Sequence, residues 1–402
     1  MAHPIASPPR IQLGLTEPLF RENLIQMNRL KVRSINLLLC AVLALASAHA
    51  ARSQGVYPGD TWQNASARER TRWSNEKLAD ARKYSQSIGS TAVMIVQGGK
   101  VIDQWGAVDK NLVCYSMRKS LLSAVFGIAV QQGKIDPQAT LAQLNIDDVP
   151  PLTPEEKQAK VVDLLRARSG VYHLVPYETA GMTAARPPRG SHPPGSFWYY
   201  NNWDFDTVDA IFEKEAGVSL GDAFEKEIAA PIQMQDFAPK NVFYLKGPES
   251  AIPGFMASIS ARDLARFGLL YLRNGKWNGK QIEPADWVYK SSHTQEMVHA
   301  GGFDLGGYEY LWWVDYKGAG LPGVTLPDGT YSARGAGGHY LLIIPALDMV
   351  IVHRAGNEPA SWSIPDVTRS SNEHGVSAPQ FGALVKLILS AYDATGQPQT
   401  AY

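Results

Sequence analysis

The chain has 402 residues with 38 basic and 38 acidic side chains, so its formal net charge is zero. This balance argues against a nucleic-acid-binding protein, whose affinity depends on an excess of positive charge. Apolar residues make up 45% and aromatic residues 10%, which suits one large domain or two closely packed ones and argues against disorder. Two cysteines cannot form a disulfide framework, and no Cys and His residues have the spacing of a metal site.

The first fifty residues have the pattern of a secretory signal peptide. A basic stretch at 29–33 precedes an apolar run at 35–46, and small residues in a cleavage pattern follow up to Ala50. The run is too short to span a bilayer permanently. We therefore expect residues 1–50 to be an N-terminal extension and signal peptide cleaved near Ala50, and the mature protein to be periplasmic or extracellular. A start at Met27 and a buried N-terminal helix are the alternatives.

The first elements after this segment are a helix and a hairpin. Residues 65–87 have a polar amphipathic pattern and predict a helix. Two β-rich runs, 91–96 and 101–105, are separated by a Gly-Gly pair, which is typical of a hairpin. Residues 117–132 are apolar nearly all round, which indicates a buried helix.

The middle of the chain predicts mainly helices. Thr153 and Glu156 have the spacing of a capping box, so a helix is expected to start there and to run towards Gly170. Residues 183–196, rich in Pro, Arg and Gly, predict a loop. Further helices are expected over 204–216, 219–229 and 261–273.

Strand patterns return after residue 305. Strands are expected over 308–314, 339–344 and 349–353, the last two joined by a Pro-Ala-Leu-Asp turn, and a final helix over 378–394. Strands and a helix at both ends with helices between them predict an α+β fold. Its antiparallel sheet is built from both chain ends and flanked by helices, with an inserted all-helical subdomain. The expected bounds are 51–108 and 301–402 for the α/β subdomain and 109–300 for the helical one.

Ser116 and Lys119 form an S-x-x-K pattern at the start of the most apolar helix. Residues three apart share a helix face, and a buried neutral lysine can accept a serine proton. Ser74 and Lys77 repeat the pattern on a charged, solvated helix, where nothing favours a neutral amine. The alternative is that Ser116 caps the helix and Lys119 lies on the surface.

Other residues could also carry chemistry. The Tyr200-Asn201-Asn202 sequence offers a phenol as a proton shuttle and an amide that orients a lysine or a substrate, although the surrounding aromatic residues fit a plain core. The G-x-S-x-G at 217–221 follows a helix rather than a strand, so Ser219 more simply caps the next helix. A histidine base for a Ser-His-Asp arrangement stays open, with three candidates: His173, His192 and His339.

A glycine-rich segment, 334–338, precedes the strand expected at 339–344. Glycines there let another group approach the backbone closely, as an N–H group of an oxyanion hole requires. A bulge or a turn is the alternative explanation.

Four motifs in this order resemble one known family, the serine β-lactamase and penicillin-recognising superfamily. They are YSMRKS at 115–120, LLRARSG at 164–170, PGSFWYYNN at 194–202 and SARDLARFG at 260–268. The chain is most similar to the class C-like branch of esterases, D-aminopeptidases and 6-aminohexanoate-dimer hydrolases. The resemblance covers roughly residues 85–395 and implies a β-lactamase/transpeptidase-like fold.

The resemblance also implies roles for individual residues. Ser116 matches the acylated nucleophile, Lys119 its proton acceptor, Tyr200 the general acid and base, and Asn202 the end of the Y-x-N motif. The backbone N–H groups of Ser116 and Ala336 are expected to form the oxyanion hole. Further residues are expected at the substrate pocket: Tyr172, Gly335 and Gly337. No cofactor is implied, because this chemistry needs only side chains and water.

The third motif departs from the family pattern. β-Lactamases and D,D-peptidases have K-T-G there, whereas this chain has Arg-Gly-Ala-Gly at 334–337. A planar guanidinium does not replace a lysine, so recognition of a substrate carboxylate is in doubt. The expected function is an exported serine hydrolase that acts on a small-molecule ester or amide. A β-lactamase or D-Ala-D-Ala peptidase-like enzyme and a non-catalytic ligand-binding relative are the alternatives, and the oligomeric state stays open.

Overall fold

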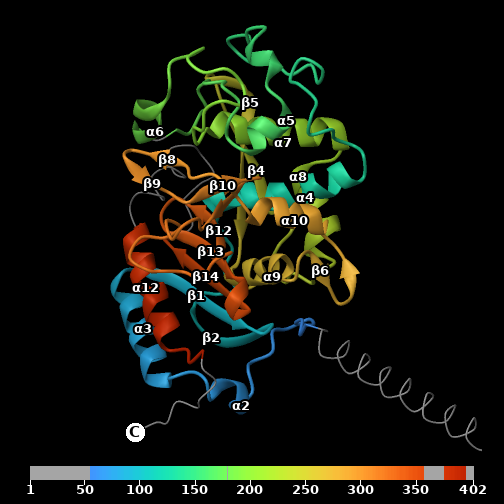
Figure 1. The fold of residues 1–402 in the computed structure, drawn as a ribbon. Coiled ribbons are helices and arrows are strands. Elements are labelled where there is room, and N and C mark those ends of the chain that lie inside the picture. Colours follow the sequence, from blue (N-terminus) through green and yellow to red (C-terminus); the bar gives the residue numbers. More distant parts are fainter. Residues whose placement is uncertain (1–54, 179, 357–374, 395–402) are drawn as a thin grey trace, which may run out of the picture. The chain divides into compact units, whose positions relative to one another are not determined.

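A seven-stranded antiparallel sheet lies at the centre of the computed structural model, which describes residues 55–178, 180–356 and 375–394 (Figure 1). Its strand order is β10-β11-β12-β13-β14-β1-β2, so strands from the two ends of the chain pair directly. The strands are β1 (Ser90–Gln97), β2 (Lys100–Gly106), β10 (Gly307–Glu309), β11 (Trp312–Val314), β12 (Tyr331–Gly335), β13 (His339–Ile344) and β14 (Met349–Ala355).

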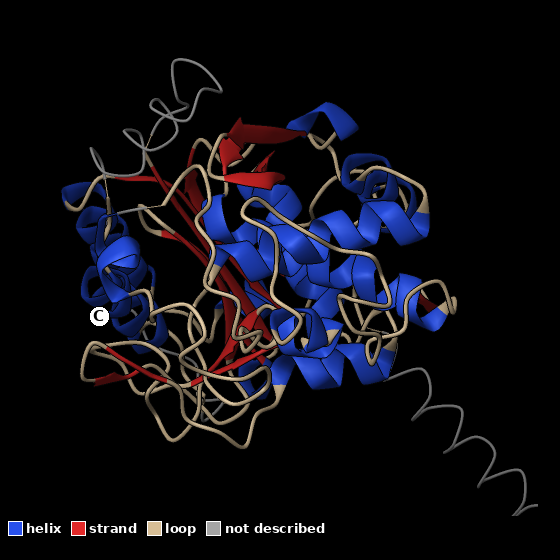
Figure 2. Cartoon of the chain, turned by 90° about the horizontal axis from the view of Figure 1, so that it is seen from above, coloured by secondary structure: helices blue, strands red, loops and turns tan. Residues whose placement is uncertain are grey.

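Both faces of this sheet are buried, because helices cover each of them. Alternate residues of a strand point to opposite faces. Met94 of β1 accordingly joins one hydrophobic cluster and Ile95 the other. Helices α3 (Asn75–Ser87) and α12 (Ala378–Ser390) pack on the Ile95 side, and α9 (Ala261–Leu272) on the Met94 side. Figure 2 shows the strands between this helix pair and a larger group of helices.

The larger group comes from the middle of the chain, and in Figure 1 its helices lie together at one end of the sheet. It contains η1 (Tyr115–Met117), α4 (Arg118–Gln131), η2 (Glu156–Gln158), α5 (Val161–Leu165), α6 (Ala180–Ala185), α7 (Asn202–Ala216), α8 (Leu220–Phe224), η3 (Glu225–Ala229), η4 (Pro239–Asn241) and α10 (Ala285–Ser292). The remaining short elements are α2 (Ala67–Arg70), η5 (Pro345–Leu347) and the hairpins β6–β7 (Lys276–Trp277, Lys280–Gln281) and β8–β9 (His299–Ala300, Phe303–Asp304). No helix in the described ranges is long and apolar enough to cross a membrane.

The α+β class, the hairpins and a sheet made from both chain ends are confirmed. The middle region also contains strands that the sequence pattern did not predict. A three-stranded sheet has the order β3-β5-β4, with β3 (Leu112–Val113), β4 (Val242–Gly247) and β5 (Ser250–Ile259). The β5 sequence contains Pro and Gly and lacks regular alternation, so it carries no clear strand signal. Contacts join the described residues from Gly55 onward into one unit, and the subdomain bounds stay predictions.

Several expected elements are divided in the structure. The strand expected over 308–314 is the hairpin β10–β11, because the backbone turns through positive φ at Tyr310 and Leu311. The helix expected over 65–87 is α2 and α3, since Ser74 caps a new helix. Thr153 and Glu156 do form reciprocal capping bonds, yet only η2 and α5 follow.

Two other expected elements differ from the structure at one boundary. The loop expected at 183–196 begins within α6, and the final helix ends at Ser390. The proposed signal peptide at 1–50 lies outside the described residues.

Candidate active site

Ser116 lies in the turn that leads into α4, and it is partly exposed. The preceding residue, Tyr115, has φ +46°, a left-handed conformation that costs free energy in a residue with a bulky side chain. Met117 is the cap residue of α4 and no side-chain capping bond is present there. The structure therefore does not support the alternative that Ser116 is a helix cap.

Lys119 is buried and joins three of the predicted site residues. Its Nζ lies 2.9 Å from Ser116 Oγ, 2.7 Å from Tyr200 Oη and 2.8 Å from Asn202 Oδ1. Only 1% of the lysine is exposed, so the alternative of a surface lysine is wrong. Segments about 80 residues apart in sequence thus meet at one amine.

Burial holds the pKa of Lys119 well below its usual range, and the neighbouring Arg118 charge lowers it further. The Asp206 carboxylate opposes this shift. A neutral amine has two N–H groups and one lone pair. These match donation to Tyr200 and Asn202 and acceptance of the Ser116 hydroxyl proton. The arrangement can therefore remove the proton of Ser116.

Tyr200 is suited to the complementary role of proton donor. Burial raises the pKa of its phenol to about 12, although Ser116, Arg118 and Arg334 each lower it. Its ring is stacked on Trp313 at 5.4 Å between centroids. At neutral pH the phenol therefore keeps its proton and can pass it to a leaving group.

The LLRARSG and PGSFWYYNN motifs bind each other and fix the start of α7. Asn201 Nδ2 donates to Val171 O at 2.6 Å and to Asp204 Oδ1 at 2.7 Å. Ser169 Oγ donates to the same Asp204 oxygen at 2.5 Å. The sequence analysis assigned no role to Ser169 or Asp204. The sequence feature that could have indicated them is the order of the two motifs next to Tyr200.

The glycine-rich segment forms the end of β12 and, over 336–338, the turn of the β12–β13 hairpin, as the turn alternative expects. Its first glycine, Gly335, packs so closely on the nucleophile turn that an added Cβ would clash with the Cys114 carbonyl oxygen. His353 binds this turn, because its Nδ1 donates to Gly338 O at 2.6 Å. The hairpin therefore lies beside Ser116. The roles predicted for Ala336 and Gly337 stay predictions.

The free edge of β12 also lies at this end of the hairpin. β11 pairs only with the first two residues of β12, Tyr331 and Ser332. Residues 333–335 of β12 therefore form no strand pairing with β11. Such an edge can accept an extended acyl chain.

Arg334, at the start of the altered third motif, binds other groups of the protein. Its Nη2 donates to Gly320 O at 2.5 Å and its Nε to Ser332 Oγ at 2.9 Å. Its guanidinium also lies over Trp313, 5.0 Å from the ring centre. Burial lowers the pKa of Arg334 to about 10, and the group is still charged at neutral pH.

Tyr172 and the three histidines have contacts away from Lys119. Tyr172 Oη lies 3.1 Å from His192 Nδ1, in the loop before Tyr200. His173 Nδ1 lies 3.0 Å from Asp148 Oδ2, and His339 accepts a hydrogen bond from a buried arginine. The geometry supports lysine rather than histidine as the base. The pocket role of Tyr172 stays a prediction.

The remaining motifs are structural. Ser219 caps α8, and Gly217 ends α7 in a left-handed conformation. Within the described ranges no group of three or more His, Cys, Asp or Glu residues could hold a metal ion.

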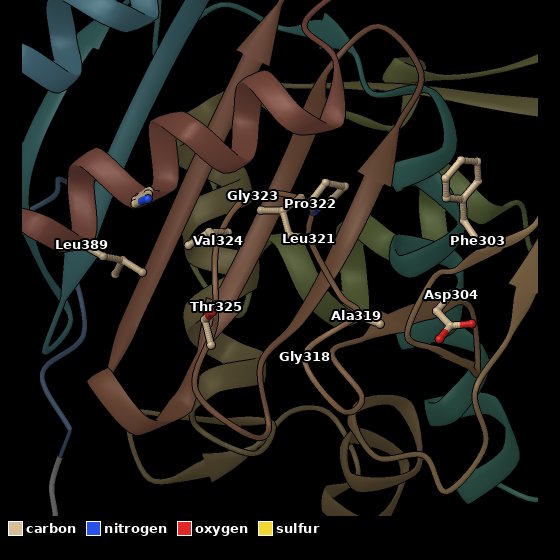
Figure 3. A pocket seen from close by; sticks show the side chains of 11 residues that line it. Phe303, Asp304, Gly318, Ala319, Leu321, Pro322, Gly323, Val324, Thr325 and Leu389 are labelled. Carbon is tan, nitrogen blue, oxygen red and sulfur yellow. The ribbon is translucent and has the colours of Figure 1, made fainter.

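A cavity of about 750 Å³ lies apart from the residues around Lys119 (Figure 3). Its lining comes from β9, the segment 318–325 and α12, and includes neither Ser116 nor Lys119. Polar groups suited to acyl transfer meet at Ser116, so the chemistry, rather than the cavity size, identifies the candidate site.

Comparisons with known proteins give the same family as the motifs. A family model described as Beta-lactamase matches residues 75–353. The 6-aminohexanoate-dimer hydrolase of Paenarthrobacter ureafaciens is 24% identical over 334 residues, which are 72% of this chain and 77% of that protein. A putative 6-aminohexanoate-dimer hydrolase from Bacillus anthracis has a TM-score of 0.56 at 20% identity, covering 77% of this chain and 80% of that one. A family VIII carboxylesterase has a TM-score of 0.55 at 15% identity, covering 79% and 97%.

The two structures share the fold of this protein, which confirms the expected β-lactamase/transpeptidase-like architecture. The family model covers more than half of the chain, including Ser116, Lys119 and Tyr200. The protein therefore belongs to the β-lactamase family and is related to its serine hydrolases.

Proposed function

We propose that this protein is an exported serine hydrolase that cleaves a small ester or amide through an acyl-enzyme on Ser116. The observation that carries the proposal is the position of Lys119, whose buried Nζ lies within 2.9 Å of Ser116 Oγ and also contacts Tyr200 and Asn202. A buried neutral amine at this distance from a hydroxyl is an activated nucleophile arrangement.

The first half of the reaction transfers an acyl group to the enzyme. Ser116 Oγ attacks the substrate carbonyl carbon while its proton moves to Lys119 Nζ. The resulting oxyanion accepts hydrogen bonds from the N–H groups of Ser116 and Ala336. Tyr200 then protonates the leaving alcohol or amine as its bond to carbon breaks, and the Lys119 proton replaces the one that Tyr200 has lost.

The second half returns the free enzyme. Water attacks the acyl carbon, and the same groups accept its proton and return one to Ser116 Oγ as the ester bond breaks. Asn202 keeps Lys119 oriented throughout. Tyr172, Gly335 and Gly337 border the acyl pocket in this proposal.

The state of Arg334 favours a neutral ester or amide over a β-lactam. Its donors Nε and Nη2 are already bound to Ser332 and Gly320, and its face covers Trp313. A K-T-G motif instead offers a cation and a hydroxyl to a substrate carboxylate, and this chain has neither group in that form.

Turnover of p-nitrophenyl acetate and butyrate by purified protein, compared with Ser116→Ala, tests the proposal. We expect turnover and fluorophosphonate labelling by the parent protein only. If the two proteins are equally inactive and neither is labelled, the non-catalytic alternative is correct. Nitrocefin and 6-aminohexanoate dimer, assayed alongside, distinguish β-lactam, amide and ester substrates.

Export is tested separately. Fractionation of cells that express the full chain should recover the protein outside the cytoplasm with an N-terminus near residue 51, and an uncleaved cytoplasmic chain contradicts this part of the proposal.

A further inference from the structure

Arg118 precedes Lys119 in α4, and its side chain is also buried, with 1% exposed. The guanidinium carbon lies over the rings of Tyr177 and Phe255, at 5.3 and 4.8 Å from their centres. A guanidinium keeps its proton at neutral pH even when it is buried. A permanent positive charge is therefore held inside the protein next to the amine that must accept a proton.

Hydrogen bonds fix this charge to α7. Arg118 Nη2 donates to Tyr177 Oη at 2.6 Å. Tyr177 Oη in turn lies 2.7 and 2.6 Å from the two Asp206 oxygens, to which it donates its single proton. The direct distance from Arg118 Nη2 to Asp206 Oδ1 is 3.6 Å. Asp206 lies one helical turn after Asn202, so α7 carries both the amide that orients Lys119 and the carboxylate that balances Arg118.

Burial lowers the pKa of Lys119 most, the Arg118 charge lowers it further and the Asp206 charge raises it. From α7, burial also raises the pKa of Asp204 and Asp209 well above the usual range. Burial raises the pKa of Asp206 only to about 6, so this carboxylate is mostly charged at neutral pH. Three groups from other elements also act on Tyr200 or Arg118. Tyr177 and Tyr308 are neutral phenols, and the Arg334 charge acts on Tyr200.

We propose that the buried Arg118 charge adds to burial in keeping Lys119 in the uncharged form that accepts the Ser116 proton, and that Asp206 limits this effect. This inference rests on the proposed function, because it explains how the same site is activated. Arg118 is a positioning residue rather than a catalytic one, since it acts through Lys119. The step it governs is the transfer of the Ser116 Oγ proton to the Lys119 lone pair as the Oγ–carbon bond forms.

The test is the pH dependence of kcat/KM for p-nitrophenyl acetate in four variants. Activity requires neutral Lys119, so kcat/KM rises with pH through the pKa of this amine. Arg118→Met should move that rise to a pH about one unit higher. Below the rise, kcat/KM should be roughly tenfold lower than in the parent, and at higher pH it should return to the parent value. Asp206→Asn removes the opposing charge and should move the rise downward. Arg118→Lys keeps the positive charge and should leave the rise near its original pH.

The fourth variant protects the test against misfolding. Arg118→Met alone leaves Asp206 without its partner in the interior, which is destabilising. The double variant Arg118→Met/Asp206→Asn removes both charges, and its rise should lie between those of the single variants. Circular dichroism and thermal unfolding establish which variants fold. If Arg118→Met does not fold, two results suffice: a downward shift in Asp206→Asn, and a rise in the double variant at higher pH than in Asp206→Asn.

The outcomes separate this inference from the proposed function. Uniform loss of activity at every pH in Arg118→Met, with the rise unmoved, shows a purely structural residue and overturns the inference while leaving the hydrolase proposal intact. An unmoved rise in Asp206→Asn, or a double variant whose rise coincides with that of Asp206→Asn, also overturns it. A parent protein no more active than Ser116→Ala overturns both. The pH dependence of the fluorophosphonate labelling rate should show the same shifts, because labelling also requires an activated Ser116.

Discussion

Ser116 with Lys119 and Ser74 with Lys77 share the S-x-x-K spacing on helices, but their surroundings are opposite. Lys119 is buried and contacts Ser116, Tyr200 and Asn202. Ser74 caps α3 by accepting from Lys77 N at 3.3 Å, and the exposed Lys77 Nζ donates to Ser390 O at 3.0 Å. Spacing brings serine and lysine to one helix face in both cases. Burial makes only the Lys119 amine a proton acceptor.

Replacing the two lysines gives the sharpest test of this comparison. Lys119→Met should lower kcat/KM by about 10³-fold, because a proton acceptor in the transition state contributes on that scale. Lys77→Met should leave kcat/KM unchanged. Steady-state assays on p-nitrophenyl acetate measure both, with thermal unfolding as the check on folding. Equal losses in the two variants would mean that burial does not distinguish the two copies.

The loss of the Tyr200 hydroxyl should have the next largest effect. Tyr200→Phe removes the proton donor and should lower kcat/KM by about 10²-fold, most strongly for substrates with poor leaving groups. Tyr199→Phe removes a phenol one residue away, which donates to Met182 O at 3.0 Å. This control should cost about 1 kcal/mol of stability and little activity. If Tyr200→Phe lowers kcat/KM equally for substrates with good and poor leaving groups, Tyr200 is not the proton donor.

The close packing of the hairpin on the Ser116 turn predicts a smaller effect. A Cβ at Gly335 meets the Cys114 carbonyl oxygen, so Gly335→Ala should shift the turn and lower kcat/KM about tenfold, with a loss of about 2 kcal/mol in stability. Gly59 is the matched control, since its added Cβ meets nothing within 4 Å. Gly59→Ala should change neither quantity. Full activity in Gly335→Ala would show that the hairpin is not needed to position Ser116.

The smallest effect belongs to the second copy of the motif. Ser74→Ala removes a helix cap and should lower the free energy of unfolding by about 1 kcal/mol without changing kcat/KM. Urea denaturation with parallel activity assays measures both. A change in kcat/KM would indicate that α3 influences the site, contrary to its place on the other side of the sheet.

Much of the site was predictable because its parts are local in sequence. The S-x-x-K spacing indicated Ser116 and Lys119, whereas the roles of Tyr200 and Asn202 followed from the resemblance of their compact motif to the family. The ordered motifs also predicted the family. What could not be predicted depends on contacts between distant segments.

Tyr177 and Asp206 show why those contacts escape sequence analysis. A tyrosine in an irregular segment and an aspartate on a helix have no pattern that reveals a shared arginine, yet both meet Arg118. The same holds for β5, which has few strand-forming features of its own. It forms a hairpin with the neighbouring β4, and the distant β3 pairs with it only through tertiary packing.

The pairing of β1 with β14 has a consequence for synthesis. Ser90 lies opposite Ala355, and between these strands the chain contributes Ser116, Lys119, Tyr200 and the β12–β13 hairpin. The central sheet cannot close until the ribosome has produced β14, and such distant pairing is slow. The newly made chain therefore cannot assemble the complete candidate site before β14 has been synthesised.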